Sequence, residues 1–181
     1  MLFSITAAFN TVTDISPDIL AGLGIRGLIL DIDNTLADHN DPQPADGVIE
    51  WIERMKENGI RMIIVSNNFY LRVKLFSELV GIDYVRESKK PFQKGYKLAA
   101  MKLGLPKRAL AAVGDQIFTD VLGANIFKIK MLYTMPTGRN NRLMRIRKAI
   151  EAPFIPKKIY YSDGLRTVDH HLLNAITYKE N

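Results

Sequence analysis

Two aspartates separated by one residue, Asp31 and Asp33, follow an apolar run from Gly27 to Leu30. A continuous apolar run of this length is typical of a buried parallel strand, and open parallel sheets bind ligands beyond the carboxyl ends of their strands. Two close carboxylates repel each other unless a cation bridges them or one takes up a proton. The pair therefore indicates a nucleophile with an acid/base partner, or a Mg²⁺ site, while an Asx turn with two solvated aspartates is the alternative.

A second set of polar residues follows the apolar run from Arg61 to Val65. Ser66, Asn67 and Asn68 offer a hydroxyl and backbone N–H groups where a helix begins, which suits an anion. A simple helix cap is the alternative interpretation. Further on, Lys90-Pro91 precedes another helical pattern, where a lysine could reach inward or remain a solvated surface charge.

A third apolar run, Leu110 to Val113, leads into Gly114 and Asp115, and Asp120 follows five residues after Asp115. Glycine at position 114 permits a close approach of other atoms to the backbone. Asp115 is therefore expected at the same sheet edge as Asp31. For Asp120, capping of the following helix is an equal alternative.

Taken together and in order, these segments resemble the four motifs of the haloacid dehalogenase-like phosphohydrolase superfamily. The matching segments are Asp31-Ile32-Asp33-Asn34-Thr35, Ser66-Asn67-Asn68, Lys90-Pro91 and Gly114-Asp115-Gln116-Ile117-Phe118-Thr119-Asp120. The resemblance spans about residues 15 to 135. The entry Ile25 to Leu36, with Gly114-Asp115-Gln116 and an arginine-rich tail, is similar to the YqeG-type branch of subclass IIIA, whose relatives include mitochondrial phosphatidylglycerophosphate phosphatases.

The resemblance implies a role for each motif residue. Asp31 would be the nucleophile that becomes an aspartyl phosphate, Asp33 the acid and base, and Lys90 the motif lysine, with Lys89 the less favoured choice because Pro91 follows Lys90. Mg²⁺ would be held by the Asp31 carboxylate, the Asp33 backbone carbonyl and Asp115, with support from Asp120. Phosphate binding falls to Ser66, the backbone at Asn67, and Thr35, which would orient the first loop.

The elements that must position these residues alternate between strand and helix patterns. Strands are predicted at 27–30, 61–65, 110–113 and 130–133, with a weaker one at 83–85, and helices at 16–24, 46–58, 70–80 and 93–103. This order predicts an α/β fold, a doubly wound parallel sheet in a three-layer αβα arrangement, as one domain over residues 1–181. The spacings from Asp33 to Ser66 and from Ser66 to Lys90 leave no room for a cap domain, so the site is open and suits a phosphate carried on something large or on a surface.

Composition narrows the chemistry further. The 181 residues are 47% hydrophobic and 24% charged, enough for a buried core. With no cysteine and three histidines, disulfides, thiolate zinc sites, iron–sulfur clusters and thiol catalysis are excluded, and any metal must sit on oxygen ligands. The net charge of +6 favours anionic partners.

The C-terminal region carries a basic segment from about residue 139, with Arg139, Arg142, Arg145, Arg147 and Lys148 and no acid up to Ile150. A weakly amphipathic helix here would suit an anionic membrane surface, nucleic acid, or plain solvent. No signal peptide or membrane-spanning run is evident, so we expect a cytoplasmic protein, with peripheral binding at the inner membrane surface as an option. His170 and His171 are expected at the surface, and residues 157–181 offer no readable chemistry.

The sequence thus predicts a Mg²⁺-dependent phosphomonoesterase acting on phosphatidylglycerophosphate. A phosphatase for nucleic-acid ends or phosphoproteins is the alternative among enzymes. A non-catalytic basic interaction module is the alternative from another class, but it should have lost at least one of Asp31, Asp33, Lys90 and Asp115, and all four are present.

Overall fold

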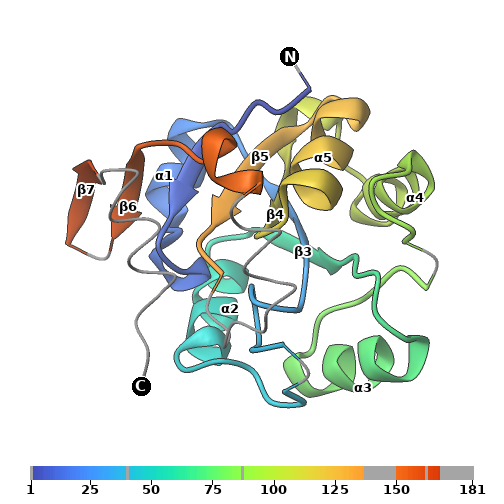
Figure 1. Cartoon of the computed structure of the whole chain (residues 1–181). Helices are drawn as coiled ribbons and strands as arrows, with labels where there is room; N and C mark the ends of the chain where they lie inside the picture. Colours follow the sequence, from blue (N-terminus) through green and yellow to red (C-terminus); the bar gives the residue numbers. More distant parts are fainter. Residues whose placement is uncertain (1, 40, 87, 137–149, 162, 168–181) are drawn as a thin grey trace.

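A computed structural model describes residues 2–39, 41–86, 88–136, 150–161 and 163–167, and a seven-stranded sheet forms its centre (Figure 1). The strand order is β3-β2-β4-β5-β1-β6-β7. Neighbouring strands are parallel except β6 and β7, which pair antiparallel. The strands are β1 (Ala7–Phe9), β2 (Gly27–Leu30), β3 (Arg61–Ile64), β4 (Leu110–Gly114), β5 (Lys130–Thr134), β6 (Lys158–Tyr161) and β7 (Gly164–Thr167).

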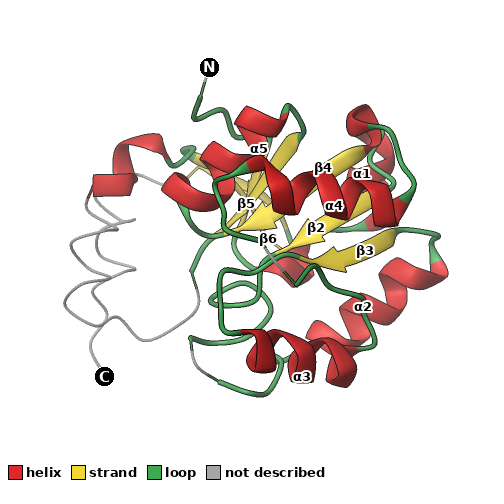
Figure 2. Ribbon diagram, turned by 90° about the vertical axis from the view of Figure 1, so that its right-hand side faces the viewer, coloured by secondary structure: helices red, strands yellow, loops and turns green. Residues whose placement is uncertain are grey.

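Helices cover both faces of the sheet (Figure 2). They are α1 (Pro17–Gly22), α2 (Val48–Glu57), α3 (Tyr70–Val80), α4 (Gln93–Leu103) and α5 (Leu122–Phe127). Alternate residues of the strands feed two separate cores: Leu28 and Leu30 of β2 pack with α1, α2 and α3, whereas Ile29 packs with α4 and α5. The predicted three-layer αβα arrangement is therefore confirmed.

The sequence patterns located most elements well. The strand predicted at 27–30 has the observed bounds, and the strands at 61–65, 110–113 and 130–133 differ from β3, β4 and β5 by one residue. The helices at 70–80 and 93–103 coincide with α3 and α4. The weaker prediction of a strand at 83–85 was wrong, because only an isolated bridge between Ile64 and Tyr84 forms there.

Three strands were not predicted, and a physical reason is evident for each. β1 is only three residues long, too short to show a periodicity, yet it pairs with both β5 and β6. β6 and β7 form a short hairpin in which all four residues of β7 are exposed, so its sequence has no apolar pattern. Helix α5 was not predicted either, because it is short and follows the π-helical turn Ile117–Val121 instead of beginning at a capping residue.

No cap domain appears in the described part of the chain. One loop, α2 and β3 separate Asp33 from Ser66, and mainly α3 separates Ser66 from Lys90. Nor does any described helix have the length and apolar character needed to cross a bilayer. The basic helix predicted from residue 139 lies outside the described residues, apart from Ile150 at its end. His170 and His171 lie outside them as well.

Candidate active site

The site begins at two adjacent strands that end in aspartates. β2 and β4 are hydrogen-bonded neighbours in parallel register, so Asp31 and Asp115, which follow them, emerge at the same sheet edge. The Asp31 backbone N–H extends the pairing by donating to the Val113 carbonyl at 3.0 Å. Both aspartates are buried. The topology therefore brings together two carboxylates that lie 84 residues apart in sequence (115 minus 31).

Asp120 joins them because the chain turns back over β4. The π-helical turn Ile117–Val121 places the Asp120 side chain directly against Gly114, where a Cβ atom would lie 2.4 Å from the Asp120 Cγ. Only glycine leaves room for that carboxylate. The Asp120 Oδ2 also accepts a hydrogen bond from the Gln116 backbone N–H at 3.2 Å. The sequence left open whether Asp120 caps the following helix. In the structure its carboxylate lies beside Asp31 and Asp115.

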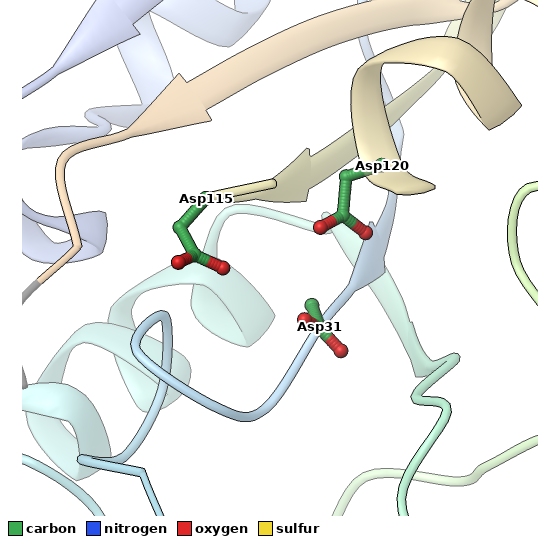
Figure 3. A group of neighbouring side chains, drawn as sticks. All are labelled: Asp31, Asp115 and Asp120. Carbon is green, nitrogen blue, oxygen red and sulfur yellow. The ribbon is translucent and has the colours of Figure 1, made fainter. Parts of the chain in front are cut away.

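The three aspartates form a compact carboxylate cluster (Figure 3). Asp31, Asp115 and Asp120 each offer an oxygen within 4.8 Å of the others, and all three are buried. Buried carboxylates at this spacing repel strongly unless positive charge lies among them. Carboxylate oxygens are the ligands that hard divalent cations such as Mg²⁺ and Ca²⁺ prefer, so these residues fit a metal site. The cluster could therefore hold a divalent metal ion.

Lys90 supplies the one ammonium group that contacts this cluster among the described residues. Its Nζ lies 2.7 Å from Asp31 Oδ1 and 2.7 Å from Asp120 Oδ1. Burial opposes the charge on the ammonium, but the carboxylates of Asp120 and Asp31 outweigh it and raise the pKa of Lys90 above its ordinary value. Burial, together with the neighbouring Asp31, raises the pKa of Asp120 to about 6 against the opposing effect of Lys90. One lysine thus does not balance the negative charge of the cluster.

The loop that carries Lys90 is held by a side-chain amide. Asn67 Oδ1 accepts from the Lys90 backbone N–H at 2.6 Å, and Asn67 Nδ2 donates to the Lys90 carbonyl at 2.9 Å. Ser88 Oγ also donates to Asn67 Oδ1 at 2.8 Å. The Asn67 side chain therefore positions Lys90. Of Asn67, only the backbone N–H is left to bind a phosphate. Neighbouring Lys89 is exposed, so the structure places Lys90 and not Lys89 at the carboxylates.

Asp33 lies in a different environment from Asp31. Its Oδ2 accepts from Asn68 Nδ2 at 2.7 Å, and its Oδ1 accepts from Arg72 Nη2 at 2.7 Å. His39 Nδ1 stands 4.0 Å from the same Oδ1. Arg72 was not predicted from the sequence, because an arginine in the first turn of α3 has the same pattern as any exposed helical arginine.

The loop after β2 turns sharply between Asp33 and Ala37. Asn34 adopts a left-handed conformation, φ 56°, which asparagine tolerates better than most residues, and its Nδ2 lies 3.4 Å from Asp115 Oδ2. Thr35 is buried, and its backbone N–H donates to the Ile32 carbonyl at 3.1 Å. Thr35 Oγ1 has no hydrogen-bond partner within the described residues. Through its backbone, Thr35 forms part of this turn, and its predicted role toward phosphate stays a prediction.

A cleft of about 420 Å³ opens above these groups. Its walls come from the ends of β2 and β3, the start of α3, the Lys90 loop and the turn before α5: Asp31, Asp33, His39, Ser66, Asn67, Asn68, Phe69, Lys90, Gln116 and Thr119. The predicted nucleophile, acid/base, lysine and phosphate-binding Ser66 and Asn67 thus share one cavity. Asp115, Asp120 and Thr35 do not line it.

The family of the chain follows from comparison with known proteins. Residues 40–127 match the family described as haloacid dehalogenase-like hydrolase. The chain is 44% identical over 138 residues to the probable phosphatase YqeG of Bacillus subtilis (strain 168), which covers 76% of this chain and 80% of that protein. The chain therefore belongs to the haloacid dehalogenase-like hydrolases, in the YqeG-type branch. It is a phosphatase, as the four motifs predicted.

Two further relatives are more distant. Phosphatidylglycerophosphate phosphatase 1, chloroplastic/mitochondrial, of Arabidopsis thaliana is 25% identical over 169 residues, and the mitochondrial phosphatidylglycerophosphatase GEP4 of Saccharomyces cerevisiae is 34% identical over 116 residues. These matches cover 88% and 56% of this chain, and 49% and 62% of those proteins. Among solved structures, a haloacid dehalogenase-like hydrolase of Brucella suis 1330 superposes with a TM-score of 0.50 at 12% identity, over 66% of this chain and 91% of that one, which supports the fold.

Proposed function

We propose that this phosphatase hydrolyses a phosphomonoester with Mg²⁺ through a covalent phosphate on Asp31, and that its substrate is phosphatidylglycerophosphate. The observation that carries the mechanism is the position of Asp31. Its carboxylate faces the cleft, lies 2.7 Å from the Lys90 ammonium, and belongs to the buried cluster with Asp115 and Asp120.

Positive charge is the first requirement of the reaction, because an anionic nucleophile must approach an anionic phosphoryl group. We assign Mg²⁺ to the carboxylates of Asp31, Asp115 and Asp120 and the backbone carbonyl of Asp33. When bound, Mg²⁺ supplies positive charge that offsets the phosphoryl oxygens. Lys90 adds a positive charge beside Asp31, and the carboxylates of Asp31 and Asp120 hold its ammonium group in place.

Bond making and breaking fall to the two aspartates of one loop. A carboxylate oxygen of Asp31 forms a bond to phosphorus, the ester P–O bond breaks, and protonated Asp33 gives its proton to the leaving oxygen. Water then attacks phosphorus, Asp33 takes the proton from that water, and phosphate leaves while the Asp31 carboxylate is restored. Ser66 Oγ and the backbone N–H at Asn67 hold the phosphoryl oxygens, and Thr35 keeps the first loop in shape.

The lipid substrate is supported by three observations. Two relatives bear the name of phosphatidylglycerophosphate phosphatases. The described part of the chain has no cap that would close over a small metabolite, so the cleft can receive a phosphate held on a surface. The net charge of +6 favours an anionic surface. We further propose that residues 1–181 form one domain, that its basic extension from about residue 139 assists at that surface, and that the enzyme is cytoplasmic and peripheral.

The test is phosphate release from phosphatidylglycerophosphate in mixed micelles with Mg²⁺, compared with a soluble phosphate ester, a 5′-phosphorylated oligonucleotide and a phosphopeptide. Wild-type protein is run beside Asp31→Asn, with Asp41→Asn as the control for loss of one carboxylate. A strong preference for the lipid that depends on Asp31 is expected. A preference for the oligonucleotide or the phosphopeptide contradicts the lipid substrate and retains the phosphatase.

A further inference from the structure

Helix α3 exposes an apolar stripe that the fold does not use. Val73, Phe76 and Val80 face the core, yet three leucines at a spacing of four residues, Leu71, Leu75 and Leu79, remain 49–63% exposed. Figures 1 and 2 show α3 at the periphery of the molecule, with no other described element on its outer side. In α2, which belongs to the same layer, Ile49 is the one large apolar side chain left exposed. The stripe therefore needs another explanation than the core.

The residue that precedes α3 connects this helix to the cleft. Phe69, the residue before α3, is 85% exposed and lines the cleft beside Asn67 and Asn68. Tyr70 is exposed as well. A second exposed phenylalanine, Phe92, lies two residues after Lys90 in the sequence. An exposed phenylalanine in the wall of a polar cleft, with further exposed aromatic residues next to it in the sequence, indicates a contact surface, because water disfavours exposed apolar side chains.

Basic side chains lie on α3 and beside its first residue. The Arg86 guanidinium lies over the Tyr70 ring at 4.7 Å from its centre. Lys89 is exposed beside the cleft lysine, and Lys74 projects from α3, where Glu78 pairs with it at 3.6 Å. A leucine stripe with aromatic and basic neighbours is the chemistry of a helix that lies in the plane of an anionic bilayer.

We propose that Phe69, Leu71, Leu75 and Leu79 form a membrane-docking face that seats the enzyme on an anionic phospholipid bilayer. The inference rests on the proposed function and deepens it, since the face adjoins the mouth of the cleft. The leucines enter the boundary between headgroups and acyl chains, while Arg86 and Lys89 meet lipid phosphates. Docking by this face brings the open cleft to the level of the headgroups, so the lipid phosphate reaches the site without leaving the membrane.

Vesicle binding tests the face independently of catalysis. Full-length protein is floated with vesicles of equal parts phosphatidylglycerol and phosphatidylcholine, or of phosphatidylcholine alone, without any phosphomonoester. The test variant carries Leu71→Gln, Leu75→Gln and Leu79→Gln. The matched control carries Leu2→Gln, Met101→Gln and Leu165→Gln, which change three leucine or methionine side chains that are 50–68% exposed on other parts of the fold.

The expected result is binding to the anionic vesicles only, at least about tenfold weaker for the α3 variant and within about twofold of wild type for the control. Both variants should hydrolyse a soluble ester at the wild-type rate. As a second measurement, Leu75→Trp should show a blue shift of fluorescence with anionic vesicles, against the background of buried Trp51. The absence of that shift, or equal loss of binding in both triple variants, overturns the proposal.

Two further outcomes separate the possible failures. If the α3 variant turns a wild-type dimer into a monomer and binds vesicles normally, the face joins two copies of the chain and the proposal is overturned. Because the vesicles contain no phosphomonoester, intact α3-dependent binding without hydrolysis of phosphatidylglycerophosphate contradicts the proposed substrate alone. Hydrolysis of that lipid without α3-dependent binding contradicts the docking face alone.

Discussion

The inner end of the cleft and its mouth are built from the same loops but differ in kind. At the inner end, Asp31 and Lys90 are buried with Asp115 and Asp120 behind them, and direct ion pairs fix their positions. At the mouth, Asp33 is held by Asn68 and Arg72, and Phe69 is largely exposed. Two aspartates that are two residues apart in sequence are thus both buried but have different partners, an ammonium for Asp31 and a guanidinium with an amide for Asp33.

This difference teaches how one motif can serve two chemical roles. The Lys90 ammonium, 2.7 Å away, holds the buried Asp31 carboxylate in one position, which suits a nucleophile. Asp33 lines the same cleft, where Asn68 and Arg72 hold its carboxylate in place, which suits an acid and base. We therefore expect substitution of the nucleophile Asp31 to abolish turnover, and substitution of Arg72, which only holds Asp33, to reduce it moderately.

The largest effect is expected for Asp31→Asn. The amide cannot form the covalent phosphate and leaves Lys90 with one charged partner fewer, so kcat for a soluble ester should fall by at least about 10³-fold. Steady-state phosphate release measures it. The control Asp41→Asn, in the exposed loop that follows, should be close to wild type. A fall of less than tenfold for Asp31→Asn would remove the distinction between the two ends of the cleft.

Withdrawal of divalent metal should come next. A chelator should abolish activity, and excess Mg²⁺ should restore it, because within the described residues Lys90 is the one ammonium beside three buried carboxylates. At a hundred times its dissociation constant, the ion should also stabilise the fold by about 2.7 kcal/mol in thermal unfolding. Asp115→Asn should raise the Mg²⁺ concentration for half-maximal rate at least about tenfold. Activity that persists after exhaustive chelation would contradict the metal assignment.

Lys90→Met should lower kcat by about 10²-fold to 10³-fold, because Asp31 and Asp120 lose their shared ammonium and the phosphoryl group loses a fixed charge. The matched control is Lys89→Met, which removes the exposed neighbouring lysine and should retain full activity on a soluble ester. Thermal unfolding with Mg²⁺ distinguishes lost catalysis from lost folding. Equal effects at positions 89 and 90 would show that charge alone matters, and not the inner position.

The smallest effect is expected at the mouth. Arg72→Met removes one of two groups that hold Asp33, and since Asn68 still binds the other oxygen, kcat should fall only about fivefold to tenfold. Lys74→Met, half a turn further along α3, is the control. A loss as large as that of Asp31→Asn would mean that Arg72 acts on the substrate directly and that the mouth is part of the inner site.

Much of this could be predicted from the sequence, because the strands that position the site are continuous apolar runs that are followed by aspartate or serine. Once β2 and β4 are neighbours, Asp31 and Asp115 must meet. The contacts of Ser88 and Arg72 could not be predicted, since they depend on how a loop and a helix return over the sheet. The exposure of the α3 leucines could not be predicted either, because a helical apolar pattern does not say which part of a wide apolar face is covered.

The central claim is that Asp31 carries the phosphate during turnover. The most direct measurement is rapid acid quenching of Asp33→Asn during turnover with Mg²⁺, a variant in which hydrolysis of the intermediate should be slowed, followed by peptide mass spectrometry. The account predicts a hydroxylamine-sensitive phosphate on the peptide that contains Asp31, and none when Asp31→Asn is added. A stable phosphate on another residue would contradict it.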